Sequence, residues 1–405
     1  MHICLVTSSR PFDWGVGGEE KDTISLGKWL QNQGYAVTIV GRKLFGVAID
    51  EFFDATPIES KLLGEPHSLR LPYSMFALSM LVTSLLFVLH VMTINRKSRI
   101  SLLHAQDTGY GGLAAVISAK LLRVPVIVSS HGLRYKTLSY SKGISNRLLM
   151  PWEYCLDVFT SRHADLVINV SPAGEDFFDK IGVEKPKMEL IPTGIDIDSF
   201  RASEESRLSI RNELGTHNDV LLGYVGRLSE EKNLSTLVEA FARALRHDEK
   251  MKLILVGPGP SEETLRMLAY ERGIGDKVTF TGIRHDVDRI LSALDIFVLP
   301  SYTEGCSTSL QEAMASGKAI IGSDIPGISQ MVRDSEEAIL INPHRVEELE
   351  QAILLLCRNP ALRAELGRKA EERAKLYDAE VVWGRVLDAY KKSLLRKHIR
   401  TRTCT

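Results

Sequence analysis

Two carboxylates in the second half of the chain have the residue type and spacing of ligand-binding groups. Glu304 and Glu312 lie eight positions apart in EGCSTSLQEAMASG, after the apolar run 296–299 and near the start of a helical stretch. A carboxylate accepts hydrogen bonds from hydroxyl groups, and open α/β sheets bind ligands at the carboxyl ends of their strands. The alternative is that Ser309 and Glu312 form a capping box, in which Glu312 only caps a helix.

Two cations lie in a similar position earlier in the same half. Arg227 follows a strand-length apolar run in YVGRLSEEKN, and Lys232 comes five residues later near a helical stretch. Together they could direct two positive charges and several backbone donors at one diphosphate. Gly257, in LILVGPGP, marks a further strand-end turn on the same sheet. The alternative is a surface pair flanked by Glu230 and Glu231.

Glycines after the first apolar run could bring a phosphate close to backbone N–H groups. Gly15, Gly17 and Gly18 lie in SSRPFDWGVGGEE, just before a helical stretch, and helix N-termini bind anions. The spacing does not match GxGxxG, and the sequence has no GxxxxGK followed by Ser or Thr. Nicotinamide chemistry and P-loop ATP hydrolysis are therefore disfavoured. A plain strand-to-helix turn is the alternative.

One histidine of the N-terminal half has a position suited to chemistry. His131 follows the apolar run 125–130 and precedes Gly132, so it should project from the carboxyl end of a central strand. Residues at that end line the sites of parallel sheets, and imidazole changes its protonation near neutral pH. A structural histidine is the alternative.

Short apolar runs of strand length alternate with helical stretches along most of the chain. The first set is 2–7, 35–40, 101–105, 125–129, 166–170 and 188–191, and the second is 221–225, 252–256, 277–280, 296–299, 319–321 and 338–341. This alternation predicts parallel, doubly wound sheets. We expect an α/β chain of two Rossmann-like doubly wound domains that face each other across a ligand cleft.

A polar segment without strand patterns, between Gly194 and about Asp219, indicates the domain boundary. We expect an N-terminal domain at 1–200, a C-terminal domain at 201–378, and a closing helix with a basic tail at 379–405. The helix, Ala379–Lys397, has an apolar face and should pack back on the N-terminal domain. The tail should be solvated and mobile.

The stretch Met75–Ile94 contains no Asp, Glu, Lys or Arg and is followed by Arg96 and Lys97. Its length permits a membrane-spanning helix. A span here would, however, divide the strands of one hydrogen-bonded sheet between the two sides of a bilayer. We expect instead a helix buried in the N-terminal domain, or one that leaves an apolar strip at the bilayer surface.

The composition excludes several classes of protein. The chain of 405 residues has 50 basic and 51 acidic side chains, so its net charge of −1 gives no general attraction to nucleic acid. Its five cysteines lack CxxC spacing, which argues against a zinc site or a disulfide framework. The triplets Asp286–Asp288 and Asp196–Asp198 are interpreted as a helix start and a linker, not as metal sites. The N-terminus reads as a strand rather than a signal peptide.

With these motifs in order, the chain resembles the retaining nucleotide-sugar glycosyltransferases of the GT-B fold, family four, also called group 1. The segments GRLSEEKN, LVGPGP, VTFTG and EGCSTSLQEAMASGKAIIGSDIPG look like the family's donor-binding blocks, with its two glutamates separated by seven residues. The N-terminal half matches more loosely, through GVGGEE, SSHG and INVSPAGEDFF. Cys306–Ser309 departs from the Phe, Gly or Pro residues usual there, which leaves the donor sugar open.

The resemblance implies that His131 lies beside the reacting carbon and that Glu304 contacts the transferred sugar, as the catalytic residues. Arg227 and Lys232 would hold the donor diphosphate, and Glu312 the ribose hydroxyls. The other donor-binding residues implied are Gly17, Gly18, Gly257, Gly305, Cys306, Ser307, Thr308 and Ser309. No metal or cofactor is expected, because cations and helix termini can stabilise the leaving diphosphate. Either Glu304 attacks, or the acceptor enters on the face that the diphosphate leaves; the second route is favoured.

The activity implied is transfer of a sugar, with retention, from a nucleotide diphosphate sugar to a glycan or lipid-linked glycan acceptor in cell-surface polysaccharide or glycoconjugate synthesis. UDP is the expected nucleotide. One alternative is a sugar-nucleotide epimerase, which would convert the donor without an acceptor. Another is a non-catalytic sugar-nucleotide-binding protein, which would need neither Glu304 nor His131. We expect a cytoplasmic protein with peripheral contact to the inner face of the membrane.

Overall fold

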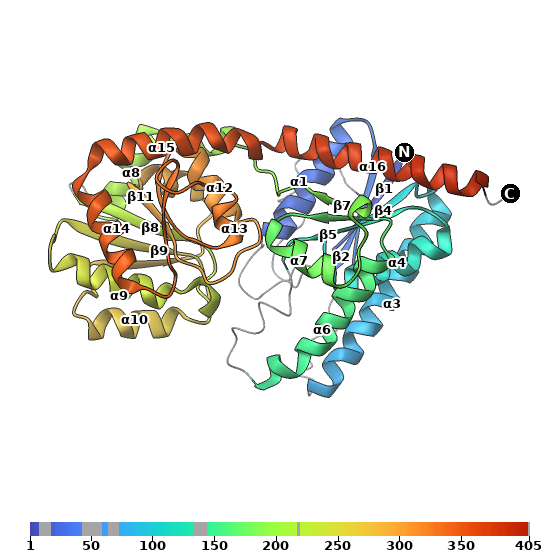
Figure 1. The fold of residues 1–405 in the computed structure, drawn as a ribbon, viewed down its shortest axis with the longest axis horizontal. Helices are drawn as coiled ribbons and strands as arrows, with labels where there is room; N and C mark the ends of the chain where they lie inside the picture. Colours follow the sequence, from blue (N-terminus) through green and yellow to red (C-terminus); the bar gives the residue numbers. More distant parts are fainter. Residues whose placement is uncertain (8–17, 43–58, 64–72, 133–143, 217–218, 404–405) are drawn as a thin grey trace. The chain divides into compact units, whose positions relative to one another are not determined.

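The computed structural model divides the chain into two compact units. Unit 1 comprises Met1–Pro192 and Val382–Thr405, and unit 2 comprises Thr193–Val381. The boundaries expected from the sequence were residues 200 and 378. The structure describes all residues except 8–17, 43–58, 64–72, 133–143, 217–218 and 404–405 (Figure 1).

Unit 1 is built on a parallel sheet. Its strands are β1 (His2–Val6), β2 (Ala36–Arg42), β3 (Glu59–Leu63), β4 (Leu102–Ala105), β5 (Val126–Ser130), β6 (Leu166–Asn169) and β7 (Met188–Leu190). They are hydrogen-bonded in the order β3-β2-β1-β4-β5-β6-β7, so the order reverses between β1 and β4. Its helices are α1 (Gly18–Asn32), α3 (Tyr73–Lys97), α4 (Tyr110–Leu122), α6 (Ile144–His163), α7 (Glu175–Lys180) and most of α16 (Ala379–Thr403).

Unit 2 repeats the same plan. Its strands are β8 (Val220–Val225), β9 (Met251–Val256), β10 (Val278–Gly282), β11 (Ile296–Leu299), β12 (Ala319–Ser323) and β13 (Ala338–Ile341), in the order β10-β9-β8-β11-β12-β13. Its helices are α8 (Glu204–Glu213), α9 (Leu234–Leu245), α10 (Glu262–Glu271), α11 (Val287–Ala293), α12 (Thr308–Ala315), α13 (Pro326–Ser329), α14 (Val346–Arg358) and α15 (Pro360–Ala374). Figure 1 shows α9 and α10 on one side of the sheet and α8, α12 and α15 on the other.

The strands form where the sequence has short apolar runs, because a parallel sheet covered by helices buries both of its faces. Every residue of β1, β4, β5, β6, β11 and β12 is buried. The sequence did not predict β3, whose five residues, ESKLL, include two charges. In the described residues this strand pairs with β2 alone, so it lies at the sheet edge, where polar residues are tolerated.

The apolar stretch 75–94 lies within α3. Phe87, Val91 and Ile94 are fully buried in the core of unit 1, against α4. On the opposite face Leu85 and Leu89 are 59% and 54% exposed. Within the described ranges of the chain, no helix has the length and apolar character needed to cross a membrane. One face of the helix is therefore buried in the N-terminal unit, as expected, and the other leaves an apolar strip exposed. Contact of this strip with a bilayer stays a prediction.

The C-terminal helix α16 packs on unit 1 through its expected apolar face. Val382, Val386 and Tyr390 are buried, and the ring centroids of Trp383 and Trp29 are 6.1 Å apart, so α16 contacts α1 (Figure 1). The helix continues to Thr403. The closing helix therefore extends six residues past Lys397, through the basic segment, where Ile399 is 63% exposed. That this segment is solvated and mobile stays a prediction.

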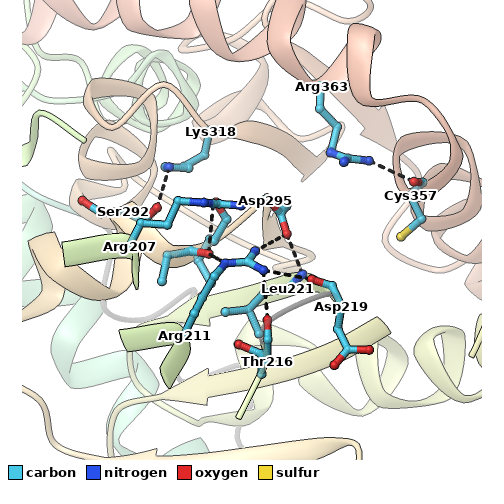
Figure 2. A network of polar contacts seen from close by, with 12 residues as sticks. Arg207, Arg211, Thr216, Asp219, Leu221, Ser292, Asp295, Lys318, Cys357 and Arg363 are labelled. Carbon is cyan, nitrogen blue, oxygen red and sulfur yellow. Dashed lines mark hydrogen bonds and ion pairs between the residues drawn. The ribbon is translucent and has the colours of Figure 1, made fainter. Parts of the chain in front are cut away.

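A network of charged side chains at the amino end of β11 connects α8 to the sheet of unit 2 (Figure 2). Asp295 Oδ1 accepts from Arg207 Nη2 at 2.9 Å, and its other oxygen accepts from Arg211 and from the Leu221 N–H. Arg211 also donates to three backbone carbonyls. Lys318 Nζ donates to the Ser292 carbonyl at 3.1 Å, and burial lowers the pKa of this amine to about 8.

Burial alone would raise the pKa of the Asp295 carboxyl. The Leu221 N–H and the guanidinium groups of Arg211 and Arg207 outweigh that effect and hold the pKa below its usual value. Since a buried charge is tolerated only when it is paired and hydrogen-bonded, this network is a structural clamp. It lies at the amino end of β11, opposite to the end that carries Glu304.

Candidate active site

The strand order of unit 2 places three of the predicted residues at one edge of its sheet. β8 and β11 are neighbours at the point where the strand order reverses. Arg227 and Lys232 follow β8, and Glu304 follows β11. Ligands of open α/β sheets bind in the crevice beyond the carboxyl ends of the two strands at this switch point. The sheet topology therefore brings the cation motif and the carboxylate motif to the same place.

A direct ion pair joins these two motifs. Lys232 Nζ lies 2.8 Å from Glu304 Oε1, and Ser301 Oγ donates to the same oxygen at 2.7 Å. The Glu304 side chain is 8% exposed and that of Lys232 is 20% exposed. Such low exposure makes a charge-assisted contact stronger than a surface pair. Glu304 is thus held in one position by groups from two loops, and Ser301 is a partner that the sequence did not indicate.

Arg227 is held by Glu231, which sequence reasoning treated only as a surface charge. Arg227 Nη2 lies 2.8 Å from Glu231 Oε1, and Ser229 Oγ donates to the same oxygen at 2.6 Å. Burial would raise the pKa of the Glu231 carboxyl, but the Ser229 hydroxyl and the Arg227 charge lower it overall.

Two glycines allow the loops around this edge to approach closely. Gly257, after β9, has φ +122°, and a Cβ there would lie 2.2 Å from the Gly226 carbonyl oxygen. A Cβ at Gly327, at the start of α13, would lie 2.1 Å from the Glu304 carbonyl oxygen. Neither space can hold a methyl group. Gly257 therefore fixes the turn beside Arg227, and Gly327, which the sequence did not single out as a site residue, fixes the backbone of Glu304.

The start of α12 differs from the capping box considered above. Ser307 is the N-cap, and its Oγ accepts from the Leu310 N–H at 3.3 Å. Ser309 lies inside the first turn, with its Oγ 3.2 Å from Ser307 Oγ. Glu312 is therefore in the second turn, too far along to cap the helix. The capping-box alternative is wrong because the helix begins earlier than that pairing requires, and Glu312 needs another explanation.

The segment between Glu304 and α12 is fixed by two amide side chains. Gln311 Nε2 donates to Cys306 Sγ at 3.3 Å and to the Thr193 carbonyl at 2.8 Å. Gln330 Nε2 donates to the Gly305 carbonyl at 3.1 Å. Thr308 is the first residue of α12, so the N–H groups of its first turn lie directly after this segment. A helix N-terminus with fixed approach residues is suited to an anion.

In unit 1, the predicted histidine lies one strand away from the switch point. His131 follows β5, and its Nε2 lies 3.4 Å from Oε1 of Gln106, which follows β4. Burial lowers the pKa of His131 to about 4, so the ring is neutral near pH 7.

Of the predicted glycines near the first strand, Gly18 is the first residue of α1. Gly15 and Gly17 lie outside the described residues. Within the described part of the chain, no group of three or more His, Cys, Asp or Glu residues is placed to hold a metal ion.

Two tandem doubly wound parallel sheets, with candidate ligand residues at the switch point of unit 2, define a two-domain α/β protein of nucleotide-binding type. Residues 206–373 match the family model "Glycosyl transferases group 1", and residues 16–199 match "Glycosyltransferase Family 4". The chain belongs to this family, the group 1 glycosyltransferases, which use nucleotide sugars, and its fold is GT-B.

Relatives and solved structures agree with this assignment. The chain is 25% identical to alpha-D-kanosaminyltransferase of Streptomyces kanamyceticus over 71% of this chain and 76% of that protein. It is 26% identical to the sulfoquinovosyl transferase SQD2 of Arabidopsis thaliana over 93% and 70%. Sucrose-phosphate synthase from Thermosynechococcus elongatus has a TM-score of 0.81 at 24% identity, over 96% and 98% of the two chains. Anabaena HepE in complex with UDP has a TM-score of 0.78 at 20% identity, over 97% and 100%.

Proposed function

We propose that the protein transfers a sugar from UDP-sugar to a glycan or lipid-linked glycan acceptor, with retention of anomeric configuration, in the synthesis of a cell-surface polysaccharide or glycoconjugate. The observation that carries the proposal is the Lys232–Glu304 ion pair, which joins the β8 and β11 loops at the switch point of unit 2. UDP is chosen because HepE, which shares the fold, binds it.

The proposed donor site follows from the chemistry of these side chains. Arg227 and Lys232 hold the diphosphate, and Glu312 accepts hydrogen bonds from the ribose hydroxyls. The remaining contacts within unit 2 come from Gly257 and from the segment of Gly305, Cys306, Ser307, Thr308 and Ser309. The two cations and the N-terminus of α12 stabilise the leaving diphosphate, so the proposal needs no metal.

In the proposed reaction, the bond between the anomeric carbon and the phosphate oxygen breaks as the acceptor oxygen bonds to that carbon on the same face. The acceptor's proton passes to the departing phosphate oxygen. Glu304 serves as a ligand of the sugar rather than a nucleophile, because one of its oxygens already accepts from Lys232 and Ser301, which disperses its charge. His131 is neutral and so offers the sugar hydrogen bonds rather than a positive charge.

We also propose that unit 1 contacts a membrane surface peripherally, at the inner face. The face of α3 made of Leu81, Val82, Leu85 and Leu89 is 42–59% exposed. The exposed cations Arg96 and Lys97 end the same helix. An apolar strip beside positive charge suits an anionic lipid surface and would bring the enzyme to a lipid-linked acceptor.

The activity is tested by incubating the protein with UDP-glucose, UDP-galactose and UDP-N-acetylglucosamine, with and without a lipid-linked glycan extract. The proposal expects acceptor-dependent release of UDP and a product whose anomeric configuration, read from the ¹H coupling constant, equals that of the donor. Conversion of the donor to another sugar nucleotide without acceptor would favour the epimerase. Binding without turnover, equal in Glu304→Gln and the wild type, would favour a non-catalytic protein.

A further inference from the structure

A chain of buried polar side chains leads from the C-terminal helix of unit 1 to His131. Tyr390 Oη, on α16, lies 2.6 Å from His104 Nδ1, on β4. Gln106 Nε2 lies 3.1 Å from the same His104 nitrogen, and Gln106 Oε1 lies 3.4 Å from His131 Nε2. Tyr390, His104 and Gln106 are each at most 1% exposed. These four side chains thus form one continuous path. Its first step joins Tyr390 and His104, which are 286 positions apart in the sequence.

The direction of each hydrogen bond along this path can be worked out. The amide nitrogen of Gln106 only donates, so His104 Nδ1 is an acceptor and the single proton of the ring is on Nε2. That proton is donated to Ser129 Oγ, 2.8 Å away. Burial and the neighbouring His131 lower the pKa of His104 to about 3, which keeps the ring neutral. The amide oxygen of Gln106 only accepts, so His131 carries its proton on Nε2 and leaves Nδ1 as an acceptor.

If the oxygen and nitrogen of the Gln106 amide were exchanged, every hydrogen bond along the path would reverse its direction. All of these reversed bonds would be satisfied except that of Tyr390. His104 Nδ1 would then carry the proton, and Tyr390 could only accept from it. Within the described residues His104 is the hydrogen-bond partner of the Tyr390 hydroxyl, so its O–H would be left buried without an acceptor. An unsatisfied buried donor is costly. The hydroxyl of Tyr390 therefore selects the first arrangement.

We propose that Tyr390 is a positioning residue, which acts through His104 and Gln106 to hold His131 in the tautomer with its proton on Nε2. The C-terminal helix thereby controls which nitrogen of His131 can accept a hydrogen bond from a sugar hydroxyl. The tautomer itself follows from the contacts of unit 1, but its consequence for catalysis rests on the proposed function of His131.

The test is a long-range ¹H–¹⁵N imidazole correlation spectrum of the full-length protein labelled with [¹⁵N]histidine. His131 is assigned by the signals that disappear in His131→Gln, among the 11 histidines of the chain. We expect the wild type to carry the proton on Nε2 and Tyr390→Phe to shift His131 towards the Nδ1–H form. Trp383→Phe is the matched control, because Trp383 also docks α16 on unit 1, where its Nε1 donates to Asp22 at 3.4 Å. His131 should be unchanged in that variant.

A second variant, Gln106→Met, tests the proposal independently in case Tyr390→Phe does not fold. Gln106→Met interrupts the path next to His131, so Tyr390→Phe added to it should cause no further change in the His131 signals or in turnover. The proposal is overturned if His131 is identical in Tyr390→Phe and the wild type, or if the two substitutions act additively.

The activity measurement separates this proposal from the proposed function. Tyr390→Phe should lower kcat for UDP release about tenfold, the rate equivalent of one hydrogen bond, with the donor KM unchanged. If the wild type has no transferase turnover, the proposed function fails while the tautomer still decides the role of Tyr390. If turnover is normal and the tautomer does not respond to Tyr390→Phe, the role of Tyr390 alone fails.

Discussion

At the scale of single residues, the contacts of Glu304 define how its proposed role as a sugar ligand can be tested. Lys232 and Ser301 both donate to Oε1, which fixes the carboxylate beyond the end of β11. Lys232, a proposed diphosphate ligand, pairs directly with Glu304, but an amide oxygen at position 304 could still accept a hydrogen bond from it. A conservative substitution of Glu304 should therefore affect the transferred sugar more than the nucleotide.

Glu304→Gln keeps the shape of the side chain and removes its charge. We expect kcat for UDP release to fall about 10²–10³-fold, as when one electrostatic contact to a transition state is lost. The Kd for UDP should stay within about threefold of the wild type. Steady-state kinetics and calorimetry measure the two quantities. A variant that loses UDP affinity and activity in parallel would contradict the role proposed for Glu304.

The sequence indicated some of these residues and not others, for physical reasons. Arg227, Lys232 and Glu304 could be found because glycine-containing turns after apolar runs indicate strand ends. Glu231 was missed because a charged surface segment looks the same whether or not its acid pairs with a cation. Tyr390 and His104 could not be linked, because nothing local in either segment indicates a partner so distant in the chain.

At the scale of elements, one carboxylate connects α8 to the central strands of unit 2. Asp295 receives hydrogen bonds from Arg207, Arg211 and the Leu221 N–H (Figure 2). Nothing in the sequence indicated these contacts, because there Asp295 is only the residue before an apolar run. The same limit applies to β3, which lacks the apolar pattern of a buried strand.

Asp295→Ala leaves the buried guanidinium of Arg211 without its partner. We expect a loss of about 3–5 kcal/mol in the free energy of unfolding, the usual effect of breaking a buried pair. Because the folded-state pKa of Asp295 is lowered, its contribution is present above the unfolded-state pKa and is lost as the pH falls through the folded-state value. Denaturant unfolding at pH 7 and at about pH 2, well below the ordinary pKa of an aspartate, measures both effects. Asp198→Ala, in an exposed pair with Arg201, is the control and should change stability by less than about 1 kcal/mol.

Asp22, at the contact between α1 and α16, has a raised pKa, whereas the pKa of Asp295 is lowered. Burial raises the pKa of Asp22 to about 7, although the Trp383 N–H partly offsets this. The folded state therefore holds the proton more tightly than the unfolded state, and stability decreases as the pH rises from about 4 to about 7. Asp22→Asn should match the wild type at pH 4 and exceed it at pH 8, by a few kcal/mol at most. Thermal unfolding across that range is the measurement, and equal curves at pH 8 would contradict it.

At the scale of the whole molecule, the sequence predicted the two doubly wound sheets well. The reason is that a parallel sheet covered on both faces needs continuous apolar strands. All twelve predicted runs fall on strands, including β7 at the edge of its sheet. The exact bounds of the two units could not be predicted, because the residues after 192 are polar and lack a strand pattern, so no local feature marks the point of division.

The exposed face of α3 predicts a membrane-dependent property of the whole protein. Wild-type protein should float with liposomes that contain anionic lipid and less with neutral ones, and Leu85→Glu with Leu89→Glu should abolish flotation. Met267→Glu, at a 59% exposed apolar residue of α10, is the control and should float like the wild type. Protein that stays at the bottom of the gradient with anionic liposomes would contradict the proposed peripheral contact.

The central claim is that Arg227 and Glu312 belong to one nucleotide site in unit 2. Calorimetric titration of the purified protein with UDP, GDP and ADP, repeated on Arg227→Ala, Glu312→Ala and the exposed control Arg345→Ala, tests it most directly. We expect saturable binding of UDP that each site substitution weakens at least tenfold, the effect of one charge-assisted hydrogen bond, and that the control leaves unchanged. If the folded protein binds none of the three nucleotides, the site assignment is wrong.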